Sequence, residues 1–301
     1  MKQQLYVFLK VVELKSFSRA AEELYMSQPA VSQYIQSLEQ SFGTKLLERT
    51  NKVLSLTKAG EIVYVKGKEI VNLYNNMYTL IDDLTNHANG PVKIGASYTF
   101  GEYILPRILA DLKKEYPHIS PGVQIANSKE IMELVKQNSL DLGIIEGSQK
   151  GHGDLTIESF QEDRLHIVAA PSLYKELGGE GITPESLETL TWIVRESGSG
   201  TREAAETLFR QLQINPLDKL VFGSTQIIKE SVESGMGIAF LSESSFLKEL
   251  ELGTLIKIPG KGFRLSRQFS IVMKGTFQTK AVQIIIELLK NHNRIKKKAS
   301  V

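Results

Sequence analysis

Apolar residues recur at intervals of three and four along the start of the chain, which is the spacing of one face of an α-helix. The first such face consists of Leu5, Phe8, Leu9 and Val12. A second face lies within residues 17–24, where Ser18 is placed to cap the helix. A third helix follows Ser27, a candidate N-cap, and Pro29 lies in its first turn, where a missing N–H group costs nothing. The pattern therefore predicts three helices, the last two separated by a short turn.

The third helix has an apolar face and a polar face. Its apolar face consists of Val31, Tyr34, Ile35, Leu38 and Phe42. At 100° per residue, the opposite face consists of Pro29, Ser32, Gln33 and Gln36. After Gly43, the sequence LLERTNKVLSLT indicates two short strands around Asn51 and Lys52. A helix pair followed by a small hairpin predicts a winged helix-turn-helix, whose second helix can enter a major groove.

The polar face of the third helix suits a DNA groove chemically. Ser and Gln side chains both donate and accept hydrogen bonds, and a Gln amide can pair with adenine N6 and N7. Arg49 and Lys52 stand where the hairpin would touch phosphates. Residues 1–58 hold eight basic and five acidic side chains, a net charge of +3, which permits nucleic-acid binding without proving it. From these residues alone, an ordinary solvated helix face remains the alternative.

Four segments favour DNA binding over an ordinary solvated face. In chain order they are FSRAAEEL, SQPAVS, LEQSFGTKLLER and LTKAG. In this order and spacing they resemble the N-terminal domain of the LysR-type transcriptional regulators. The resemblance implies a wing that contains Arg49 and a recognition helix that contains Ser27, Gln28, Pro29, Ser32 and Gln33. The helical pattern adds Gln36 to these DNA contacts, and the hairpin adds Lys52. Many members carry Arg or Lys where this chain has Gln33, so its base preference shifts towards adenine and cannot be copied from them.

A long helix is predicted from Thr57, a candidate cap, to about His87. Its apolar positions follow alternating steps of four and three residues and are Val63, Gly67, Ile70, Tyr74, Met77, Ile81 and Leu84. Three unbroken heptads indicate a coiled-coil seam, and hence a homodimer. The alternative is a single amphipathic helix that packs on its own domain. The LysR-type family also joins its two domains through a dimerising linker helix, and it commonly forms a dimer of dimers.

From Asn89 onwards, the pattern changes to alternating strands and helices. Short strands are predicted at residues 92–96, 123–126 and 142–145, with helices near 101–115 and 128–138, and the alternation recurs with TWIV, VFG and GIAFL. It predicts an α/β domain with a largely parallel sheet. The layout resembles the effector domain of the LysR-type family, which is itself similar to the two-lobed type 2 periplasmic solute-binding proteins. The expected division is a DNA-binding domain at 1–58, a linker helix at 59–89 and an effector domain at 90–301, with one lobe at 92–163 plus 268–293 and the other at 164–267.

Four polar turns each lie between a predicted strand and a predicted helix. Their residues are Ser97 and Thr99, Asn127 and Ser128, Ser199, Gly200 and Thr201, and Thr225 and Gln226. Helix N-termini present unpaired N–H groups, and the crevice of an open α/β sheet lies at the carboxyl ends of its strands. For any one turn the alternative is a hydroxyl that only caps its own helix, but four such turns, where the resembled family binds effectors, predict a site for a small anionic effector. Glu146 ends a strand near the same crevice, where it either contacts an ammonium group or is solvated.

Composition excludes several kinds of site. The chain has no cysteine, which excludes disulfides, thiolate metal sites and a thiol nucleophile. Its five histidines lack ligand spacing such as HExxH, GSGTR lacks the rest of a P-loop, and ESGSG is not a GxSxG elbow. We therefore expect no enzyme, no metal site and no cofactor besides the effector. No run approaches the ~18 apolar residues of a membrane span, and Lys10, Glu13 and Lys15 interrupt the only candidate signal core, so we expect a cytoplasmic protein.

These observations predict an effector-responsive transcription factor that acts as an activator or a repressor. Its expected partners are double-stranded DNA with two half-sites, a small effector, a second copy of the chain, and RNA polymerase if it activates; no membrane partner is expected. The alternative is a solute-binding transport component. That class would explain the C-terminal two thirds of the chain, but it requires export and leaves the helix-turn-helix and the heptads without a role.

Overall fold

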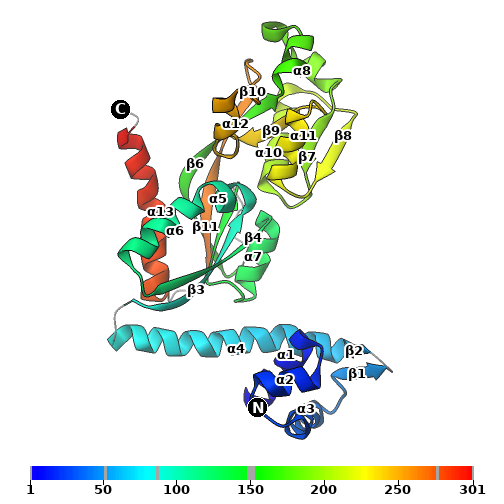
Figure 1. The fold of residues 1–301 in the computed structure, drawn as a ribbon, viewed down its shortest axis with the longest axis vertical. Coiled ribbons are helices and arrows are strands. Elements are labelled where there is room, and N and C mark those ends of the chain that lie inside the picture. Colours follow the sequence, from blue (N-terminus) through cyan, green and yellow to red (C-terminus); the bar gives the residue numbers. More distant parts are fainter. Residues whose placement is uncertain (1, 51–52, 86–87, 148–152, 276–277, 300–301) are drawn as a thin grey trace. The chain divides into compact units, whose positions relative to one another are not determined.

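The computed structural model describes residues 2–50, 53–85, 88–147, 153–275 and 278–299 (Figure 1). Internal contacts divide the chain into two compact units. The first unit contains Met1–Leu84 and Gln137–Ser139, and the second contains Thr85–Lys136 and Leu140–Val301. None of the described helices is long and apolar enough to cross a membrane.

The first unit is a winged helix-turn-helix followed by a long helix (Figure 1). Its elements are α1 (Lys2–Leu14), α2 (Phe17–Glu23), α3 (Gln28–Phe42), β1 (Leu47–Thr50), β2 (Val53–Leu56) and α4 (Lys58–Thr85). Ser27 caps α3 by accepting a hydrogen bond from a backbone N–H three residues further on, as the sequence predicts. For α2 the predicted cap is wrong by two residues. The helix begins at Phe17, so the extended residue before it, Ser16, is the cap in place of Ser18 and accepts the Arg19 amide.

The core of the first unit forms where its helices meet the hairpin. Its fully buried side chains include Val7, Phe8, Val11, Val31, Leu38 and Leu46. Phe42 was predicted to join this core but is 49% exposed. The reason is that α3 ends at this residue, and Gly43, with a φ of 67°, turns the chain away from the helix.

One buried carboxylate joins α3 to the wing. Glu39 is 7% exposed and accepts hydrogen bonds from the Leu46 and Leu47 amides at 2.9 and 3.3 Å. Its other oxygen lies 2.8 Å from Lys45 Nζ. Burial alone would raise the pKa of Glu39, but Lys45 and the two amides hold this pKa below its usual value. Glu39 therefore fixes the start of the hairpin on the end of α3.

Helix α4 divides its apolar residues between two faces. Val63 packs against the core of the first unit, and a Cβ added to Gly67 would lie 2.8 Å from Leu5 Cδ1. The exposed large apolar residues described on α4 are Ile62, Val65, Ile70, Leu73, Met77, Tyr78 and Ile81. The predicted seam is therefore wrong in its first heptad, where α4 packs on its own domain. Tyr74 is half-buried, and the side chain of Leu84 lies outside the described residues.

The second unit is built on a seven-stranded sheet with the order β10-β6-β11-β5-β3-β4 and with β9 beside β6. These strands are β3 (Gly90–Ser97), β4 (Ile119–Ala126), β5 (Leu142–Glu146), β6 (Leu155–Ala169), β9 (Ala239–Ser242), β10 (Ile256–Lys257) and β11 (Arg264–Lys274). Strand β3 runs parallel to β4 and β5, as predicted. Strand β6 is antiparallel to its neighbours β9, β10 and β11, and β11 is in turn antiparallel to β5. The prediction of a largely parallel sheet is therefore wrong for this sheet, which is mixed because two long strands run in opposite directions through it.

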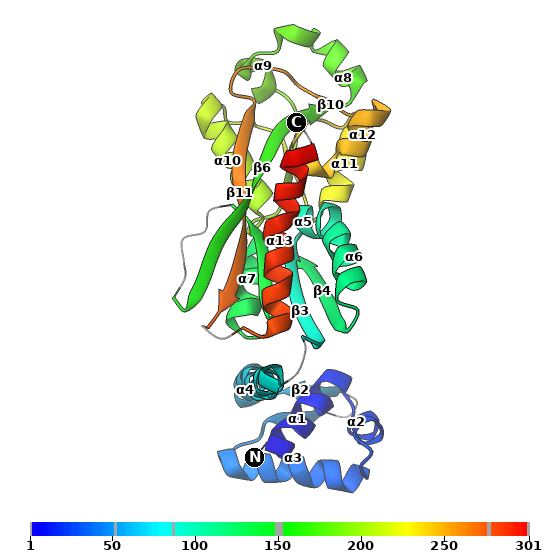
Figure 2. The same cartoon turned by 90° about the vertical axis from the view of Figure 1, so that its left-hand side faces the viewer.

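Strands β6 and β11 connect two lobes (Figure 2). Lobe I contains β3, β4, β5, α5 (Tyr98–Tyr103), α6 (Leu105–Glu115), α7 (Ser128–Lys136) and α13 (Lys280–Ala299). Lobe II contains β7 (Trp192–Arg195), β8 (Lys219–Phe222), β9, β10, α8 (Pro171–Glu176), η1 (Gly179–Gly181), α9 (Pro184–Glu188), α10 (Gly200–Leu212), α11 (Thr225–Glu233), η2 (Glu243–Ser245) and α12 (Leu247–Leu252). Strands β7 and β8 are parallel. The ladder between β6 and β11 shifts register between Phe269 and Ser270, so the two connecting strands are irregular where the lobes meet.

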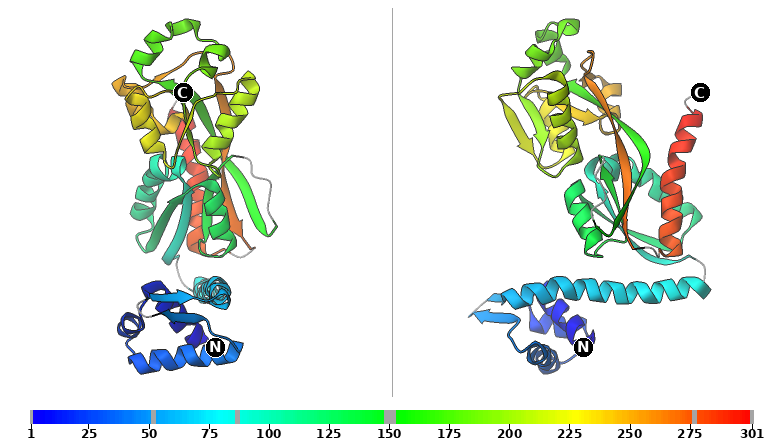
Figure 3. Two further views of the ribbon diagram at one scale, coloured as in Figure 1. Left: turned by 90° about the vertical axis from the view of Figure 1, so that its right-hand side faces the viewer. Right: turned by 180° about the vertical axis from the view of Figure 1, so that it is seen from behind.

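The helix predicted near residues 101–115 is two helices. Helix α5 ends at Tyr103 and α6 begins at Leu105, with Pro106 in the first turn of α6. A proline there lacks the N–H that would continue the helix from α5. Helices α6 and α13 lie together on one side of lobe I and share its core (Figure 3). The break leaves α5 as a separate short helix directly after β3.

Candidate functional site

The polar face of α3 is open to solvent, as groove reading requires. Its exposed side chains are Gln28, Pro29, Gln33 and Gln36. Ser32 is half-buried and accepts a hydrogen bond from Gln28 Nε2 at 3.2 Å. Ser27 holds its hydroxyl on the helix N-terminus. The predicted DNA contacts of α3 thus share one accessible surface.

The wing supplies the other predicted DNA contacts. The backbone of Arg49 lies in β1, opposite Leu54 of β2. The side chain of Arg49 and the whole of Lys52 lie outside the described residues. Their contacts with phosphates remain predictions.

The four predicted turns of the second unit lie where helices begin. Ser97 precedes α5, Ser128 begins α7, Gly200 begins α10 and Thr225 begins α11. Every predicted residue of these turns is buried except Gln226. Buried hydroxyls and amides need partners, so their hydrogen bonds indicate what the turns hold.

Three of the four turns meet at Glu146, the last residue of β5: two bond its carboxylate and the third bonds its backbone amide. The Thr99 amide donates to Glu146 Oε1 at 3.1 Å, and the Thr201 hydroxyl donates to Oε2 at 3.0 Å. Ser128 Oγ accepts the Glu146 amide at 3.1 Å. Position 200 must be glycine, because a side chain there would clash with Glu146. A Cβ at this position would lie 2.6 Å from the Cβ of Glu146 and 2.6 Å from its carbonyl oxygen. Glu146 is 1% exposed, so the interpretation as a solvated carboxylate is wrong.

A buried arginine joins Glu146 to a second carboxylate. Arg267 Nη1 lies 2.8 Å from Glu146 Oε2, and Arg267 Nε lies 2.7 Å from Asp163 Oδ2. The same guanidinium donates to the hydroxyls of Thr201 and Thr99 at 3.1 and 3.4 Å. We call Glu146, Asp163 and Arg267 the acid–arginine cluster. Because Asp163 lies on β6 and Arg267 on β11, the strands that connect the lobes carry two of its three members.

The members of the acid–arginine cluster shift one another's protonation. Burial alone would raise the pKa of Glu146, but Arg267 and the surrounding hydrogen bonds hold this pKa below its usual value. Burial raises the pKa of Asp163. This effect is larger than the lowering by Arg267 and by the Ser242 hydroxyl, which donates to Asp163 Oδ1 at 2.5 Å. Burial alone would lower the pKa of Arg267, but the two carboxylates raise it. With all three groups ionised, the cluster carries one excess negative charge.

Two of the predicted effector residues act as helix caps. Ser199 Oγ accepts the Thr201 amide at 3.2 Å. Asn127 Oδ1 accepts the Glu130 amide at 3.0 Å. For these residues the capping alternative accounts for the side-chain oxygen. The side-chain amide nitrogen of Asn127 donates to Glu130 Oε1 at 3.2 Å and to Glu196 Oε1 at 3.4 Å.

The fourth turn does not reach the acid–arginine cluster by any hydrogen bond among the described residues. Thr225 Oγ1 accepts from Arg195 Nη1 at 3.4 Å, and Gln226 Oε1 accepts from the Tyr103 hydroxyl at 3.3 Å. Both bonds lie where α5 of lobe I approaches lobe II. Thr225 and Gln226 therefore belong to a neighbouring contact between the lobes.

Sequence reasoning missed Arg267, Asp163 and Arg195. A signal for Arg267 exists in the alternation of β11, since Arg267 shares one side of the strand with the buried Phe269 and Ile271. A lone charge on an apolar strand face indicates a buried partner. Among the described residues, no group of three or more His, Asp or Glu side chains is arranged to hold a metal ion.

The comparisons with known proteins cover both units. The family model described as "Bacterial regulatory helix-turn-helix protein, lysR family" matches residues 3–61, and "LysR substrate binding domain" matches residues 85–294. The HTH-type transcriptional regulator CysL of Bacillus subtilis (strain 168) is 37% identical over 289 residues, which cover 96% of each chain.

Solved structures agree in fold. Full-length CbnR in complex with its target DNA matches with a TM-score of 0.72 at 18% identity, covering 97% of this chain and 99% of that one. The regulatory domain of Synechocystis PCC6803 CcmR in complex with 2-PG matches with a TM-score of 0.61 at 25% identity, covering 68% of this chain and 98% of that one. Since both family models match and CysL is similar over nearly the whole length, the chain belongs to the LysR family of DNA-binding transcriptional regulators with an effector-binding domain.

Proposed function

We propose that this protein controls transcription as a dimer on promoter DNA, and that a compact anion bound beside Glu146 sets its activity. The observation that carries the proposal is the meeting of three turns at buried Glu146, where one turn from each lobe donates a hydrogen bond to its carboxylate. On this proposal the protein works in the cytoplasm, contacts RNA polymerase if it activates, and catalyses no reaction. In support of the last point, the relative CysL is a transcriptional regulator.

The DNA-binding part of the proposal rests on α3 and α4. The open polar face of α3 offers Gln33 and its neighbours to base edges. The exposed apolar stripe of α4, which includes Ile70, Leu73, Met77 and Ile81, suits a second copy of the chain. A dimer presents two recognition helices and therefore selects DNA with two half-sites.

The donor set around Glu146 supports an anion as effector. A backbone amide, a hydroxyl and a guanidinium already hold the carboxylate of Glu146, which shows the chemistry of an oxyanion site. Ser97 Oγ is buried without a hydrogen-bond partner of regular geometry, although it lies close enough to Glu146 to help lower the pKa of that carboxyl. If the Glu146 carboxylate moves away, the Ser97 hydroxyl can donate to a ligand in its place.

The charge of the acid–arginine cluster dictates how an anion enters. With Glu146, Asp163 and Arg267 all ionised, the cluster has one excess negative charge, so a second anion beside an unmoved Glu146 would be repelled. An anionic effector must therefore displace the Glu146 carboxylate from Thr99, Thr201 and Arg267, or bind as that carboxylate takes up a proton. Either route changes the contact between Glu146 of lobe I and Thr201 of lobe II. A ligand shifts this balance only by its difference in affinity for the two arrangements.

Calorimetry with sulfate, phosphate and 2-PG, each followed by operator binding with and without the anion, tests the proposal. Thr99→Val keeps the shape and removes a hydroxyl, so it should weaken anion binding about five- to tenfold while basal DNA binding persists. Thr207→Val, on the exposed side of α10, is the matched control and should behave as the wild type.

Glu146→Gln tests the displacement step. The amide keeps the size and removes the competing charge, so anions should bind at least about tenfold more tightly. Binding of only neutral or cationic metabolites, together with a wild-type response of Thr99→Val, would rule out the anion site.

A further inference from the structure

A buried arginine of lobe II lies against a tyrosine of lobe I. The Arg195 guanidinium carbon is 4.3 Å from the centre of the Tyr98 ring, and Arg195 is 1% exposed. Its Nε and Nη2 donate to Glu196 Oε2 and Oε1 at 2.7 and 2.8 Å, which fixes the plane of the guanidinium. A desolvated cation on a ring face is a favourable contact, and here its two halves belong to different lobes.

A second pair of the same kind lies five residues further along α5. Lys229 Nζ is 4.8 Å from the centre of the Tyr103 ring, and Lys229 is 3% exposed. The ammonium group is held by Glu249 Oε1 at 2.5 Å, within lobe II. Burial raises the pKa of the Tyr103 hydroxyl, so it stays protonated and can donate to Gln226 Oε1 at 3.3 Å.

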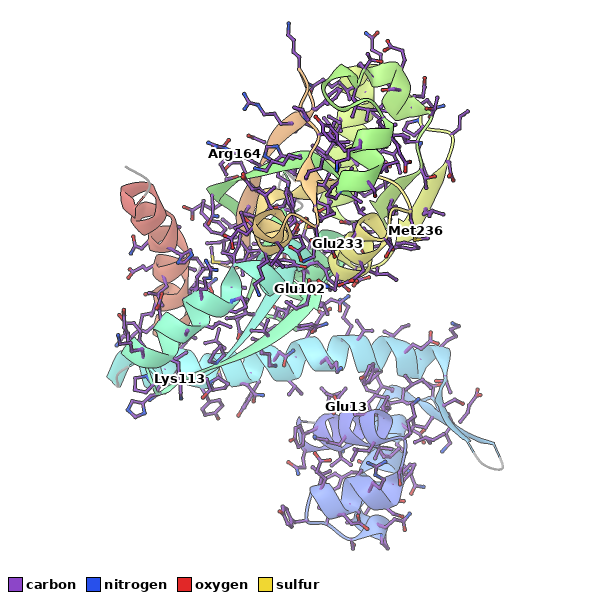
Figure 4. All side chains as sticks on the ribbon, turned by 45° about the horizontal axis from the view of Figure 1, so that its top comes forward. Glu13, Glu102, Lys113, Arg164, Glu233 and Met236 are labelled. Carbon is purple, nitrogen blue, oxygen red and sulfur yellow. The ribbon has the colours of Figure 1, made fainter. Side chains whose placement is uncertain are left out.

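The two pairs share one short helix. Helix α5 carries Tyr98 and Tyr103 at its two ends, and both rings cover cations that lobe II has already fixed by its own carboxylates. Glu102, between them on α5, interacts electrostatically with both Arg195 and Lys229 and lies where α5 approaches lobe II (Figure 4). The same helix carries Thr99, whose amide holds Glu146.

A second row of contacts crosses the lobes on the side of α7. The Lys129 amide donates to the Gly198 carbonyl at 3.2 Å, and Asn127 Nδ2 donates to Glu196 Oε1 at 3.4 Å. Glu196 is therefore shared, because it holds Arg195 beneath Tyr98 and also accepts Asn127. Rotation of the lobes about β6 and β11 would break both rows together.

We propose that α5 is an interlobe latch, in which Tyr98 and Tyr103 close over Arg195 and Lys229 and hold the lobes in the closed arrangement. The latch goes beyond the effector proposal, although it shares α5 with that site. When Thr99 and Glu146 separate, α5 shifts and its two tyrosines leave their cations. The latch thus converts a local change at Glu146 into a change of angle between the lobes.

The latch also sets how tightly an effector binds. If the effector binds only the open arrangement, its apparent affinity is its intrinsic affinity multiplied by the fraction of molecules that are open. A weaker latch raises that fraction before any effector is present. The strength of the latch is therefore measurable without knowing the effector.

Spin-label distance measurements on the full-length protein test the latch. The chain contains no cysteine, so Glu133→Cys in α7 and Arg210→Cys in α10, both exposed, place one label on each lobe. Tyr98→Leu and Tyr103→Leu should each raise the ratio of open to closed molecules on the order of tenfold. The conservative changes Tyr98→Phe and Tyr103→Phe keep the rings and should stay within about fivefold of the parent.

Two controls separate the latch from general loosening. Tyr174→Leu removes a half-buried tyrosine that packs within the core of lobe II, and it should leave the distance distribution unchanged. Fluorescence of the single tryptophan, Trp192, reports whether lobe II stays folded. If a leucine variant unfolds, Lys229→Met tests the same pair from lobe II and should open the lobes to a similar degree.

The latch is wrong if the double variant Tyr98→Leu/Tyr103→Leu folds and keeps the parental distance distribution. If the double variant does not fold, the same result for folded Lys229→Met protein refutes the latch. Because these measurements use no metabolite, they do not depend on the effector. Failure to find an anion that binds would refute the effector proposal and leave the distance result intact. Titration of the leucine variants with sulfate then shows whether apparent affinity follows the open fraction.

Discussion

Removing the cation of the acid–arginine cluster should be among the most damaging single changes in the effector domain. Arg267→Met keeps most of the side-chain volume and leaves Glu146 and Asp163, 1% and 3% exposed, without their guanidinium. Breaking a buried ion pair by removing one partner costs about 3–5 kcal/mol. With a urea m-value of about 2–3 kcal/mol/M for a unit of this size, the midpoint should fall by roughly 1–2 M.

Trp192 supplies the assay for this change. It is the only tryptophan of the chain, it is fully buried in the core of lobe II, and its ring packs edge-to-face on Phe209 at 4.7 Å. Its fluorescence therefore follows unfolding of the effector domain and not of the DNA-binding domain. Protein concentration must be the same in every titration, because a dimer is stabilised by mass action. Arg264→Met, on the exposed side of the same strand, is the matched control and should stay within about 0.5 kcal/mol of the wild type.

The pH dependence of unfolding tests whether the loss of stability in Arg267→Met comes from the two buried carboxylates. Without Arg267, burial raises the folded-state pKa of both carboxyls above the unfolded value of about 4. A carboxyl group whose pKa is raised on folding contributes stability below its unfolded pKa, and this contribution is lost as pH rises. The difference in unfolding free energy between Arg267→Met and the wild type should therefore shrink as pH falls towards about 4. Adding Glu146→Gln and Asp163→Asn removes all the charges and should restore more than half of the loss at pH 7. If the unfolding free energy of Arg267→Met at pH 7 lay within about 1 kcal/mol of the wild-type value, charge interactions would not be what stabilises the cluster.

Three further predictions concern the first unit. Gln33→Ala should cost about 1–3 kcal/mol on the best DNA site and relax preference at one base pair, measured on a randomised site library; an equal loss on all sequences would contradict base reading. Ile81→Asp should dissociate the dimer in sedimentation because it places an unpaired charge in the apolar stripe of α4, whereas Val65→Asp, outside the predicted heptad positions, should not; an unchanged dimer would exclude the stripe as the interface. Glu39→Gln should destabilise the DNA-binding domain by about 1.5–3 kcal/mol at pH 7, with exposed Glu22→Gln as the control. Since the pKa of Glu39 is lowered on folding, its contribution is present above about pH 4.3 and is lost as pH falls through the folded pKa, so amide exchange of the wing should show the two proteins converging in acid; a constant difference would contradict this role.

Local pattern was sufficient wherever an element satisfies its own hydrogen bonds and buries one regular face. The winged helix-turn-helix follows from the apolar stripes of its helices and from the cap at Ser27. Strands β3, β4 and β5 follow from short apolar runs. The same reasoning did not recover β6, because the charged segment ESFQEDR interrupts its apolar residues, and only pairing with β11 shows that this segment is strand.

The candidate site was predicted as a set of positions but not as a set of contacts. Thr99, Ser128 and Thr201 do meet, as the strand–turn–helix pattern indicates. What they hold could not be read from spacing, since Asp163 and Arg267 lie 104 positions apart and come together only through the ladder between β6 and β11. The seam of α4 shows a related limit. Heptad spacing identifies an apolar stripe, and only the fold shows which part of it the protein's own domain covers.

The route of β6 and β11 makes lobe II an insertion in the chain. The chain enters lobe II along β6 and returns along β11, and His166 and Arg264 are partners at the first register position of that ladder. A short hairpin between these residues would close the gap and leave both strands in place, whereas lobe I is assembled from two separate stretches. Exchange of lobe II between relatives therefore needs two junctions on adjacent strands. Such grafts would keep Glu146 and the Asp163–Arg267 pair from one parent, and bring the contacts of Thr201, Arg195 and Lys229 from the other.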